Sequence, residues 1–173
     1  NEKDAYIAGD SSYAQDAVNP RNMEHAVGHA VRCLYLLCGM ADCAKDTEDT
    51  PLVGACRIVV RDIIDKKMYI TGATGSTNIG EAFTIPYDLP NEKAYAETCA
   101  SIALMMFANR MAKYEKKAEY ADVVEKAMYN GMLSGLSLSG DAFFYENPLE
   151  IHPDNYKKLH DRYSITERVK VFG

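Results

Sequence analysis

The sequence has no apolar run that approaches the roughly 20 residues needed to span a bilayer. It also has no surplus of positive charge, because 19 lysines and arginines stand against 25 aspartates and glutamates, a formal net charge of −6. Nucleic acids and anionic membrane surfaces both favour a basic partner. These absences argue against a nucleic acid or a membrane as the partner of this chain.

The cysteines also lack the usual spacing of a metal or disulfide framework. Their number is odd, and Cys33, Cys38 and Cys43 are five residues apart rather than in a CxxC knuckle. These three and Cys56 lie inside apolar helical patterns. We therefore expect four buried free thiols, a reducing compartment and a cytoplasmic location. Residues 1–4 are polar, without an initiator methionine or a signal-peptide core, so we expect a chain that was cut upstream.

Length and composition predict one globular domain with a hydrophobic core. The chain has 173 residues, of which 47% are hydrophobic and 25% charged. Apolar residues at helical spacing predict helices over residues 23–44, 52–64, 100–113 and 119–136. Short strands are predicted over 142–145 and 168–172. This mainly α pattern fits a helical bundle or a toroid, and the periodicity alone does not distinguish them.

Residues 72–90 interrupt the helical pattern with glycines and prolines. A long irregular loop inside a compact helical domain is usually functional. Its start resembles a phosphate-binding loop but lacks the lysine of that motif, so we discount a phosphate site. Glu81 follows Gly80 and precedes Ala82 and Phe83. Partial desolvation raises the pKa of a carboxyl group and suits a general acid, although a solvated loop carboxylate is the commoner case.

Two further places carry reactive side chains. His25 and His29 are four residues apart, which is metal-ligand spacing on a helix, but the HExxH pattern is absent. A satisfied core histidine is the ordinary alternative for His29, and Gly28 before it allows a neighbour to approach closely. Glu97 and Cys99 are both zinc-ligand types. They can reach one metal only at a helix start or an irregular turn, and at a helix start Thr98 would be the N-cap and the positive helix end would favour a thiolate. The alternative is a helix already running from Asn91, with Cys99 in the core and Glu97 in water.

Taken together, these stretches resemble the catalytic domain of the β-L-arabinofuranosidases of glycoside hydrolase family 127. The resemblance covers nearly the whole chain, in order and at family-like spacing. Its segments are GHAVR at 28–32, YITG at 69–72, GEAF at 80–83, YDLPNE at 87–92, YAETCAS at 95–101, YNG at 129–131 and FFYENPL at 143–149.

The resemblance implies part of an (α/α)6 barrel with short β segments near the C-terminus. It also implies a retaining mechanism in which a zinc-bound cysteine thiolate attacks the sugar. By motif, Glu81 would be the general acid/base, Glu97 and Cys99 two zinc ligands, and His29 and Tyr145 hydrogen-bonding partners of the sugar. The expected substrates are plant-type glycans or glycoproteins that carry L-arabinofuranose.

The chain departs from the family pattern at its ends. The resemblance implies a Cys-x-Cys-Cys cluster, including the nucleophile, after a segment like RVKVFG at 168–173, and further helices before Asn1. We therefore expect residues 1–173 to form one partial catalytic domain that is inactive alone. Its partner would be the rest of the same protein, a complementary chain or a second copy. The alternatives are a non-catalytic carbohydrate-binding or scaffold protein, and a zinc hydrolase that uses His25, His29 and Glu97.

Overall fold

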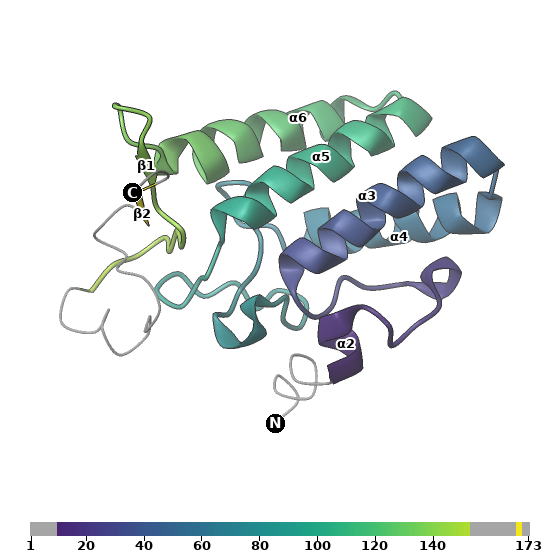
Figure 1. Cartoon of the computed structure of the whole chain (residues 1–173), viewed down its shortest axis with the longest axis horizontal. Helices are drawn as coiled ribbons and strands as arrows, with labels where there is room; N and C mark the ends of the chain where they lie inside the picture. Colours follow the sequence, from purple (N-terminus) through teal and green to yellow (C-terminus); the bar gives the residue numbers. More distant parts are fainter. Residues whose placement is uncertain (1–9, 153–168, 171–173) are drawn as a thin grey trace.

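The structure, a computed structural model, describes residues 10–152 and 169–170, and it is mainly helical. Four long helices dominate: α3 (Ala30–Thr47), α4 (Thr50–Lys66), α5 (Thr98–Tyr114) and α6 (Ala118–Lys126). They form two antiparallel hairpins, α3–α4 and α5–α6, that lie side by side (Figure 1). In the described part of the chain, no helix has the length and apolar character of a membrane span.

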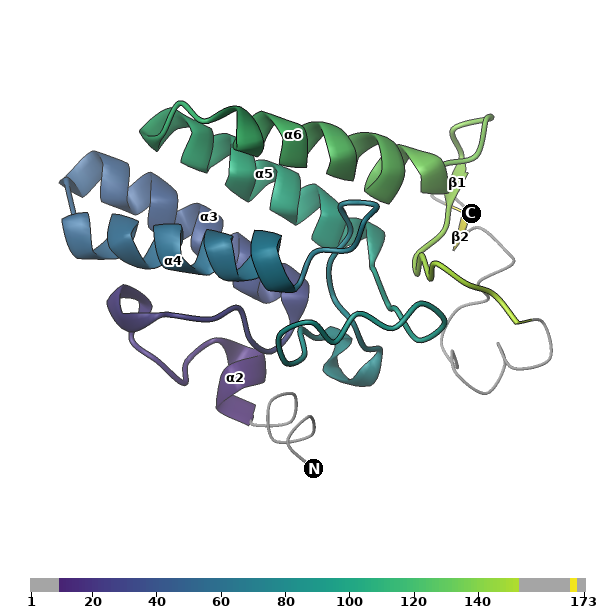
Figure 2. The same cartoon turned by 180° about the vertical axis from the view of Figure 1, so that it is seen from behind.

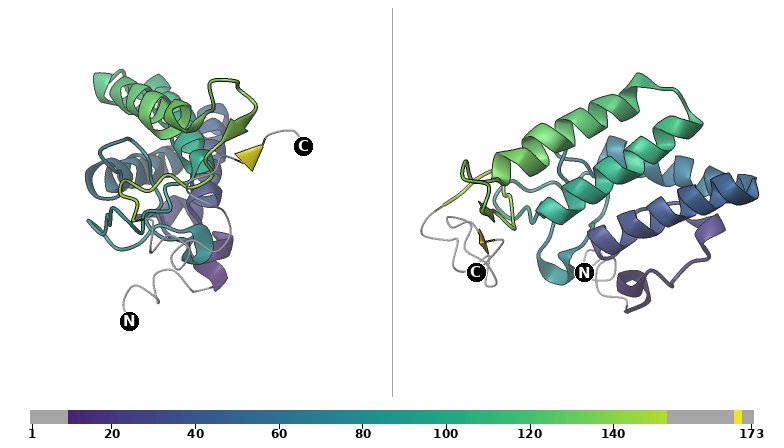
Figure 3. Two further views of the ribbon diagram at one scale, coloured as in Figure 1. Left: turned by 90° about the vertical axis from the view of Figure 1, so that its left-hand side faces the viewer. Right: turned by 45° about the horizontal axis from the view of Figure 1, so that its top comes forward.

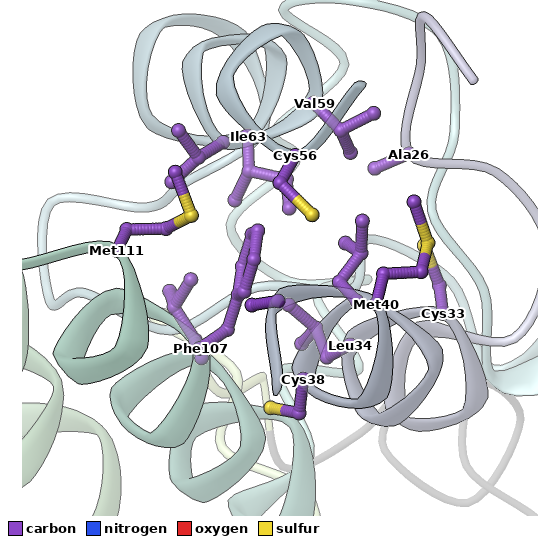
Figure 4. Close-up of a cluster of buried hydrophobic side chains, with 14 of the residues drawn as sticks. Ala26, Cys33, Leu34, Cys38, Met40, Cys56, Val59, Ile63, Phe107 and Met111 are labelled. Atoms are coloured by element: carbon purple, nitrogen blue, oxygen red, sulfur yellow. The ribbon is translucent and has the colours of Figure 1, made fainter. Parts of the chain in front are cut away.

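The core fills the space between α3, α4 and α5. Fully buried side chains come from all three helices, and Figure 4 shows them facing one another: Leu34, Val59, Ile63, Phe107 and Met111. Apolar residues at intervals of three and four place each helix's buried stripe on this side, as the hydrophobic pattern predicts. Cys33, Cys38 and Cys56 are buried here as free thiols. The expectation was wrong for Cys43, which is exposed because it lies on the side of α3 opposite the buried stripe that contains Leu34, Leu37 and Ala41.

The turn between α3 and α4 explains why the second helix starts where it does. Glu48 ends α3 with a left-handed φ of 57°. Asp49 then caps α4, and its carboxylate accepts a 3.0 Å hydrogen bond from the Leu52 N–H. Pro51 lies in the first turn, where its missing N–H costs nothing. The predicted helix over 52–64 is thus confirmed and slightly extended at both ends.

The first predicted helix begins seven residues later than expected, at Ala30 rather than residue 23. The reason is the buried ion pair of Asp62 and Lys67, which binds the backbone N–H and the carbonyl of Ala26. The Asp62 carboxylate accepts from the Ala26 N–H at 2.9 Å, and the Lys67 ammonium donates to the Ala26 carbonyl at 2.7 Å. Lys67 Nζ also lies 2.9 Å from Asp62 Oδ2. Gly28, with φ of 68°, then turns the chain into α3.

The remaining elements are short. They are α2 (Asp10–Ala14), the 3-10 turns Pro20–Asn22, Ile79–Glu81 and Leu133–Gly135, and a π-helical turn over Ala127–Met132 that continues α6. The predicted helix over 119–136 therefore exists, with a change of winding along it. Strand β1 (Ala142–Phe143) pairs antiparallel with β2 (Val169–Lys170), within the two predicted strand segments.

This arrangement brings the irregular segments together. The start of α3, the end of α4, the start of α5 and the π-helical turn all lie at one end of the two hairpins. The right-hand view of Figure 3 shows the loops gathered at that end, away from the α3–α4 and α5–α6 turns. The fold thus places the motif-bearing segments beside one another, although they are far apart in the sequence.

Candidate functional site

All five side chains predicted to carry chemistry lie at the loop end of the helices. His29 is the N-cap of α3, and Glu81 ends the 3-10 turn in the loop between α4 and α5. Glu97 is the N-cap of α5 and Cys99 lies in its first turn. Tyr145 follows β1. Figure 2 shows the α4–α5 loop crossing this end of the molecule.

His29 and Glu81 form a direct pair. Nε2 of His29 lies 3.2 Å from Oε2 of Glu81, and the two side chains are only 12% and 15% exposed. Nδ1 of His29 accepts a long 3.5 Å hydrogen bond from the Arg32 N–H, as a helix N-cap does. Because Nδ1 accepts, a neutral imidazole carries its proton on Nε2, the nitrogen that faces the Glu81 carboxyl group.

The backbone fixes this pair from both sides. The Phe83 N–H donates to the Gly28 carbonyl at 3.0 Å, and Ala82 forms a bridge with His29. Gly80 and Glu81 both have left-handed backbones, with φ of 68° and 52°. For a non-glycine residue this costs about 1–3 kcal/mol, so the surrounding bonds hold Glu81 in a strained position. Ala82 and Phe83 are fully buried, which confirms the apolar flank expected for Glu81.

Gly28 allows the close approach predicted for it. A Cβ atom at this position would lie 2.0 Å from the Ser12 carbonyl oxygen, so any side chain would displace the α2 segment. That segment carries Tyr13, whose ring meets the His29 imidazole edge-on at 5.5 Å between centroids. The Arg32 guanidinium lies 4.4 Å from the centre of the Tyr13 ring. His29 is thus held by a cap bond, a carboxylate and an aromatic ring.

Glu97 and Cys99 adjoin each other at the start of α5. The helix begins at Thr98, so Glu97 rather than Thr98 is the N-cap, and the alternative of a helix running from Asn91 is wrong. The Glu97 carboxyl group is hydrogen-bonded by the Tyr145 hydroxyl and by the Cys99 thiol. Because Glu97 lies just outside the helix, its side chain can contact that of Cys99, although the two residues are only two apart in the sequence.

Burial governs the protonation of this group. Burial, and after it the Glu97 carboxylate, raise the pKa of the Cys99 thiol to about 12. The expected thiolate at the helix start is therefore not favoured by the protein alone. Burial also raises the pKa of Glu97, against the hydrogen bonds of Tyr145 and Cys99. The charge of Glu81 acts on Glu97, Cys99 and Tyr145, which places the two carboxylates in one electrostatic cluster.

The donor types at the start of α5 fit a zinc ion. Oε2 of Glu97 is buried without a hydrogen-bond partner, and a carboxylate oxygen beside a thiol is a pair of zinc-ligand types. An unsatisfied buried carboxylate oxygen is costly unless a cation or a donor meets it. Residues 10–152 and 169–170 contain no group of three or more His, Cys, Asp or Glu able to hold a metal. Glu97 and Cys99 could therefore supply two ligands of a larger set.

Tyr95 belongs to the same cluster and was not singled out from the sequence. Its side chain is 2% exposed, and its hydroxyl has no hydrogen-bond partner among the described residues. The ring meets Tyr145 edge-on at 6.3 Å. Burial, and then the Glu81 carboxylate, raise the pKa of Tyr95 well above its usual range. Tyr95 precedes α5 in an irregular segment, so no periodicity or ligand spacing marked it.

His25 does not share a site with His29. The predicted helix would have stacked them one turn apart, but the helix begins only at Ala30. His25 Nδ1 lies 3.4 Å from Asp62 Oδ1, beside the buried Lys67 ion pair, whereas His29 faces Glu81. The interpretation of the chain as a zinc hydrolase using both histidines is therefore wrong.

Known proteins share both the sequence and the fold. A model of the GH127 β-L-arabinofuranosidase catalytic domain matches residues 3–170. A non-reducing end β-L-arabinofuranosidase from Bifidobacterium longum subsp. longum is 43% identical over 162 residues, which are 94% of this chain and 25% of that protein.

Two solved structures extend the likeness to three dimensions. A GH127 β-L-arabinofuranosidase from Geobacillus stearothermophilus T6 matches with 44% identity and a TM-score of 0.83, over 96% of this chain and 25% of that one. The GH127 β-arabinofuranosidase BT3674 matches with 43% identity and a TM-score of 0.79, over 83% and 23%. The chain thus spans about a quarter of the length of each relative.

Proposed function

Because this chain belongs to the GH127 β-L-arabinofuranosidase catalytic-domain family, we propose that it is part of a retaining, zinc-dependent glycosidase that removes L-arabinofuranose from plant-type glycans or glycoproteins. The observation that carries the proposal is the meeting of the His29–Glu81 pair with the Glu97–Cys99 pair at one end of the helices. A carboxyl group for proton transfer and two metal-ligand types are then close enough to act on one sugar.

Glu81 is the general acid/base of this proposal. Its carboxyl group would donate a proton to the oxygen of the leaving group and later take one from the attacking water, as retaining glycosidases require. The His29 Nε2 atom, 3.2 Å from Oε2, would orient the carboxyl group. His29 and Tyr145 would hydrogen-bond the sugar hydroxyls.

Glu97 and Cys99 are two of the zinc ligands of this proposal, and a Cys-x-Cys-Cys cluster expected after Gly173 would complete the set and supply the nucleophile. When bound, zinc stabilises thiolate at neutral pH. The raised pKa of Cys99 in the protein alone means that binding must release the thiol proton. The Tyr145 hydroxyl holds the Glu97 carboxyl group, whose Oε2 has no hydrogen-bond partner among the described residues.

The helical hairpins support an (α/α)6 barrel, in which paired antiparallel helices follow one another around a ring. The α3–α4 and α5–α6 hairpins would be successive pairs, with the catalytic loops at one rim (Figure 1). In this proposal residues 1–173 are part of one catalytic domain. Its partners are the carbohydrate substrate and the remaining segments of the domain, from the same protein, a complementary chain or a second copy.

A hydrolysis assay tests this function. The protein that contains this chain together with the expected cysteine cluster should hydrolyse p-nitrophenyl β-L-arabinofuranoside. NMR of the first-formed sugar should show the β configuration, because two displacements restore the original one. An inverted product would contradict the retaining mechanism. Sugar binding without hydrolysis would favour the carbohydrate-binding scaffold instead.

A further inference from the structure

Ala96, immediately before Glu97, is a strained residue at which three segments meet. Its backbone is left-handed, with φ of 41°, and its side chain is fully buried. The Ala96 N–H donates to the Gly75 carbonyl at 2.8 Å, which ties it to the loop that carries Glu81. The Ala96 carbonyl accepts from Nδ2 of Asn147 at 3.0 Å, which ties it to the segment that carries Tyr145. Such a conformation persists only where its surroundings enforce it.

Asn147 uses both hydrogens of its side-chain NH2 group for this junction. One hydrogen on Nδ2 is donated to the Ala96 carbonyl and the other to Oγ1 of Thr98, also at 3.0 Å. The Asn147 amide group is thus bonded to the residues on either side of Glu97. The Asn147 backbone N–H donates to the Tyr95 carbonyl at 3.1 Å. Three residues before and at the start of α5, Tyr95, Ala96 and Thr98, are thereby bonded to one asparagine.

Thr98 closes the junction from the helix side. Its hydroxyl accepts from Asn147 and donates to the Phe144 carbonyl at 2.6 Å, and the side chain is only 4% exposed. The Thr98 N–H belongs to the first turn of α5, which has no intrahelical partner, and it donates to the Tyr145 carbonyl at 3.0 Å. The carbonyl groups of Phe144 and Tyr145 are thus both bonded to Thr98 at the start of α5.

We propose that Thr98 and Asn147 form a positioning clamp, which sets Glu97 and Tyr145 against each other and holds the strained Ala96. In the proposed function neither clamp side chain is a zinc ligand or a sugar contact, so both would act through Glu97 and Tyr145. The proposal rests on the proposed function for its effect on catalysis, but the clamp itself is a property of the described residues. Residues that orient a metal ligand typically change metal affinity or activity by about 10–100-fold when removed.

Matched variants of the clamp separate positioning from general stability. Thr98→Val keeps the shape of the side chain and removes the hydroxyl, whereas Thr98→Ser keeps the hydroxyl. Asn147→Ala removes both amide donors. Thr47→Val is the control, because Thr47 donates from an exposed position at the end of α3 to the Cys43 carbonyl, remote from the site. The variants are made in the intact protein that contains this chain.

Three quantities are measured for each variant: kcat and KM on an aryl β-L-arabinofuranoside, zinc affinity against a chelator, and amide hydrogen exchange. Thr98→Val and Asn147→Ala should lower kcat or zinc affinity by about 10–100-fold. The amides of Ala96, Thr98 and Asn147 should exchange about fivefold faster, with α3 and α4 unchanged. Thr98→Ser and Thr47→Val should match the unsubstituted protein in all three.

The outcomes are distinguishable. Unchanged exchange at Ala96 and Thr98, or faster exchange spread equally over α3, α4 and α5, would overturn the clamp. The clamp would also be overturned if Thr98→Val and Asn147→Ala loosen these amides while kcat and zinc affinity stay unchanged. An unsubstituted protein with no arabinofuranosidase activity would instead contradict the proposed function, and the exchange and zinc measurements would still decide the clamp.

Discussion

His29 places Nε2 3.2 Å from Oε2 of Glu81, while its Nδ1 caps helix α3. One imidazole therefore links the start of a core helix to the candidate general acid. The rigid helix holds the ring, and the ring in turn holds a carboxyl group that lies on an irregular loop. The two roles of His29 can be separated, because asparagine is a good N-cap but is too short to reach Glu81.

We expect His29→Ala to lose the helix cap, the contact with Glu81 and the proposed sugar contact, and His29→Asn to keep the cap and lose the other two. A hydrogen bond to a charged group contributes about 1.5–3 kcal/mol, so kcat should fall roughly 10–100-fold in both variants. Loss of the cap should lower the free energy of unfolding by about 1 kcal/mol in His29→Ala alone. Urea titrations and steady-state kinetics measure the two effects. Full activity in His29→Asn would show that Glu81 does not depend on this bond.

The buried ion pair of Asp62 and Lys67 should make the stability of the protein fall at acid pH, because it holds the segment before His29. Burial by itself would raise the pKa of Asp62, but the Lys67 ammonium and the Ala26 N–H outweigh it and lower the pKa. A depressed folded-state pKa contributes stability that is complete above the unfolded value of about 3.9 and is lost as the pH falls through the folded value.

Asp62→Asn should therefore destabilise the protein at pH 7 and flatten the acid limb of its stability profile. Removing one partner of a buried pair costs about 3–5 kcal/mol. The gap to the unsubstituted protein should narrow as the pH falls below 3.9, measured by urea unfolding at several pH values. Lys66→Met is the control, since Lys66 Nζ lies 3.7 Å from Asp62 on a half-exposed side chain. Lys67→Met should lower the free energy of unfolding as Asp62→Asn does. An equal loss of that free energy in Lys66→Met and Lys67→Met would contradict this account.

The sequence was sufficient for what depends on local pattern. Apolar periodicity predicted the buried stripes of α4 and α5. The family motifs selected five side chains that the fold brings to one end. Their roles in binding sugar and metal stay predictions.

Other features depend on contacts between distant segments. The start of α3 moved to Ala30 because Asp62 and Lys67, from another helix, bind the peptide groups of Ala26. The ion partner of His25 lies 37 residues away in sequence, so its spacing to His29 was misleading. Asn147 reaches Thr98 across 49 residues. No periodicity or short motif encodes such pairs, and Tyr95 was overlooked for the same reason.

Zinc binding should depend on the two residues at the start of α5. In the protein that contains this chain and the expected cysteine cluster, Glu97→Gln and Cys99→Ser should each abolish stoichiometric zinc, because a tetrahedral site then lacks one ligand. Cys43→Ser is the matched control, since Cys43 is an exposed thiol on α3. Metal content after dialysis against a chelator measures the effect. A Cys99→Ser protein that retains one zinc would remove Cys99 from the ligand set.

The most direct test of the account is the kinetics of Glu81→Gln, because glutamine keeps the size of glutamate but cannot exchange a proton. For a substrate with a poor leaving group, kcat should fall about 10²–10⁴-fold, the usual contribution of a general acid. The loss of the first-step rate should shrink for an activated aryl leaving group, which needs little protonation, and the basic limb of the pH profile should flatten. Zinc content should not change, since the metal belongs to Glu97 and Cys99 in this account. Loss of zinc would make Glu81 a ligand instead, and an unchanged kcat with both substrates would contradict its role as the acid/base.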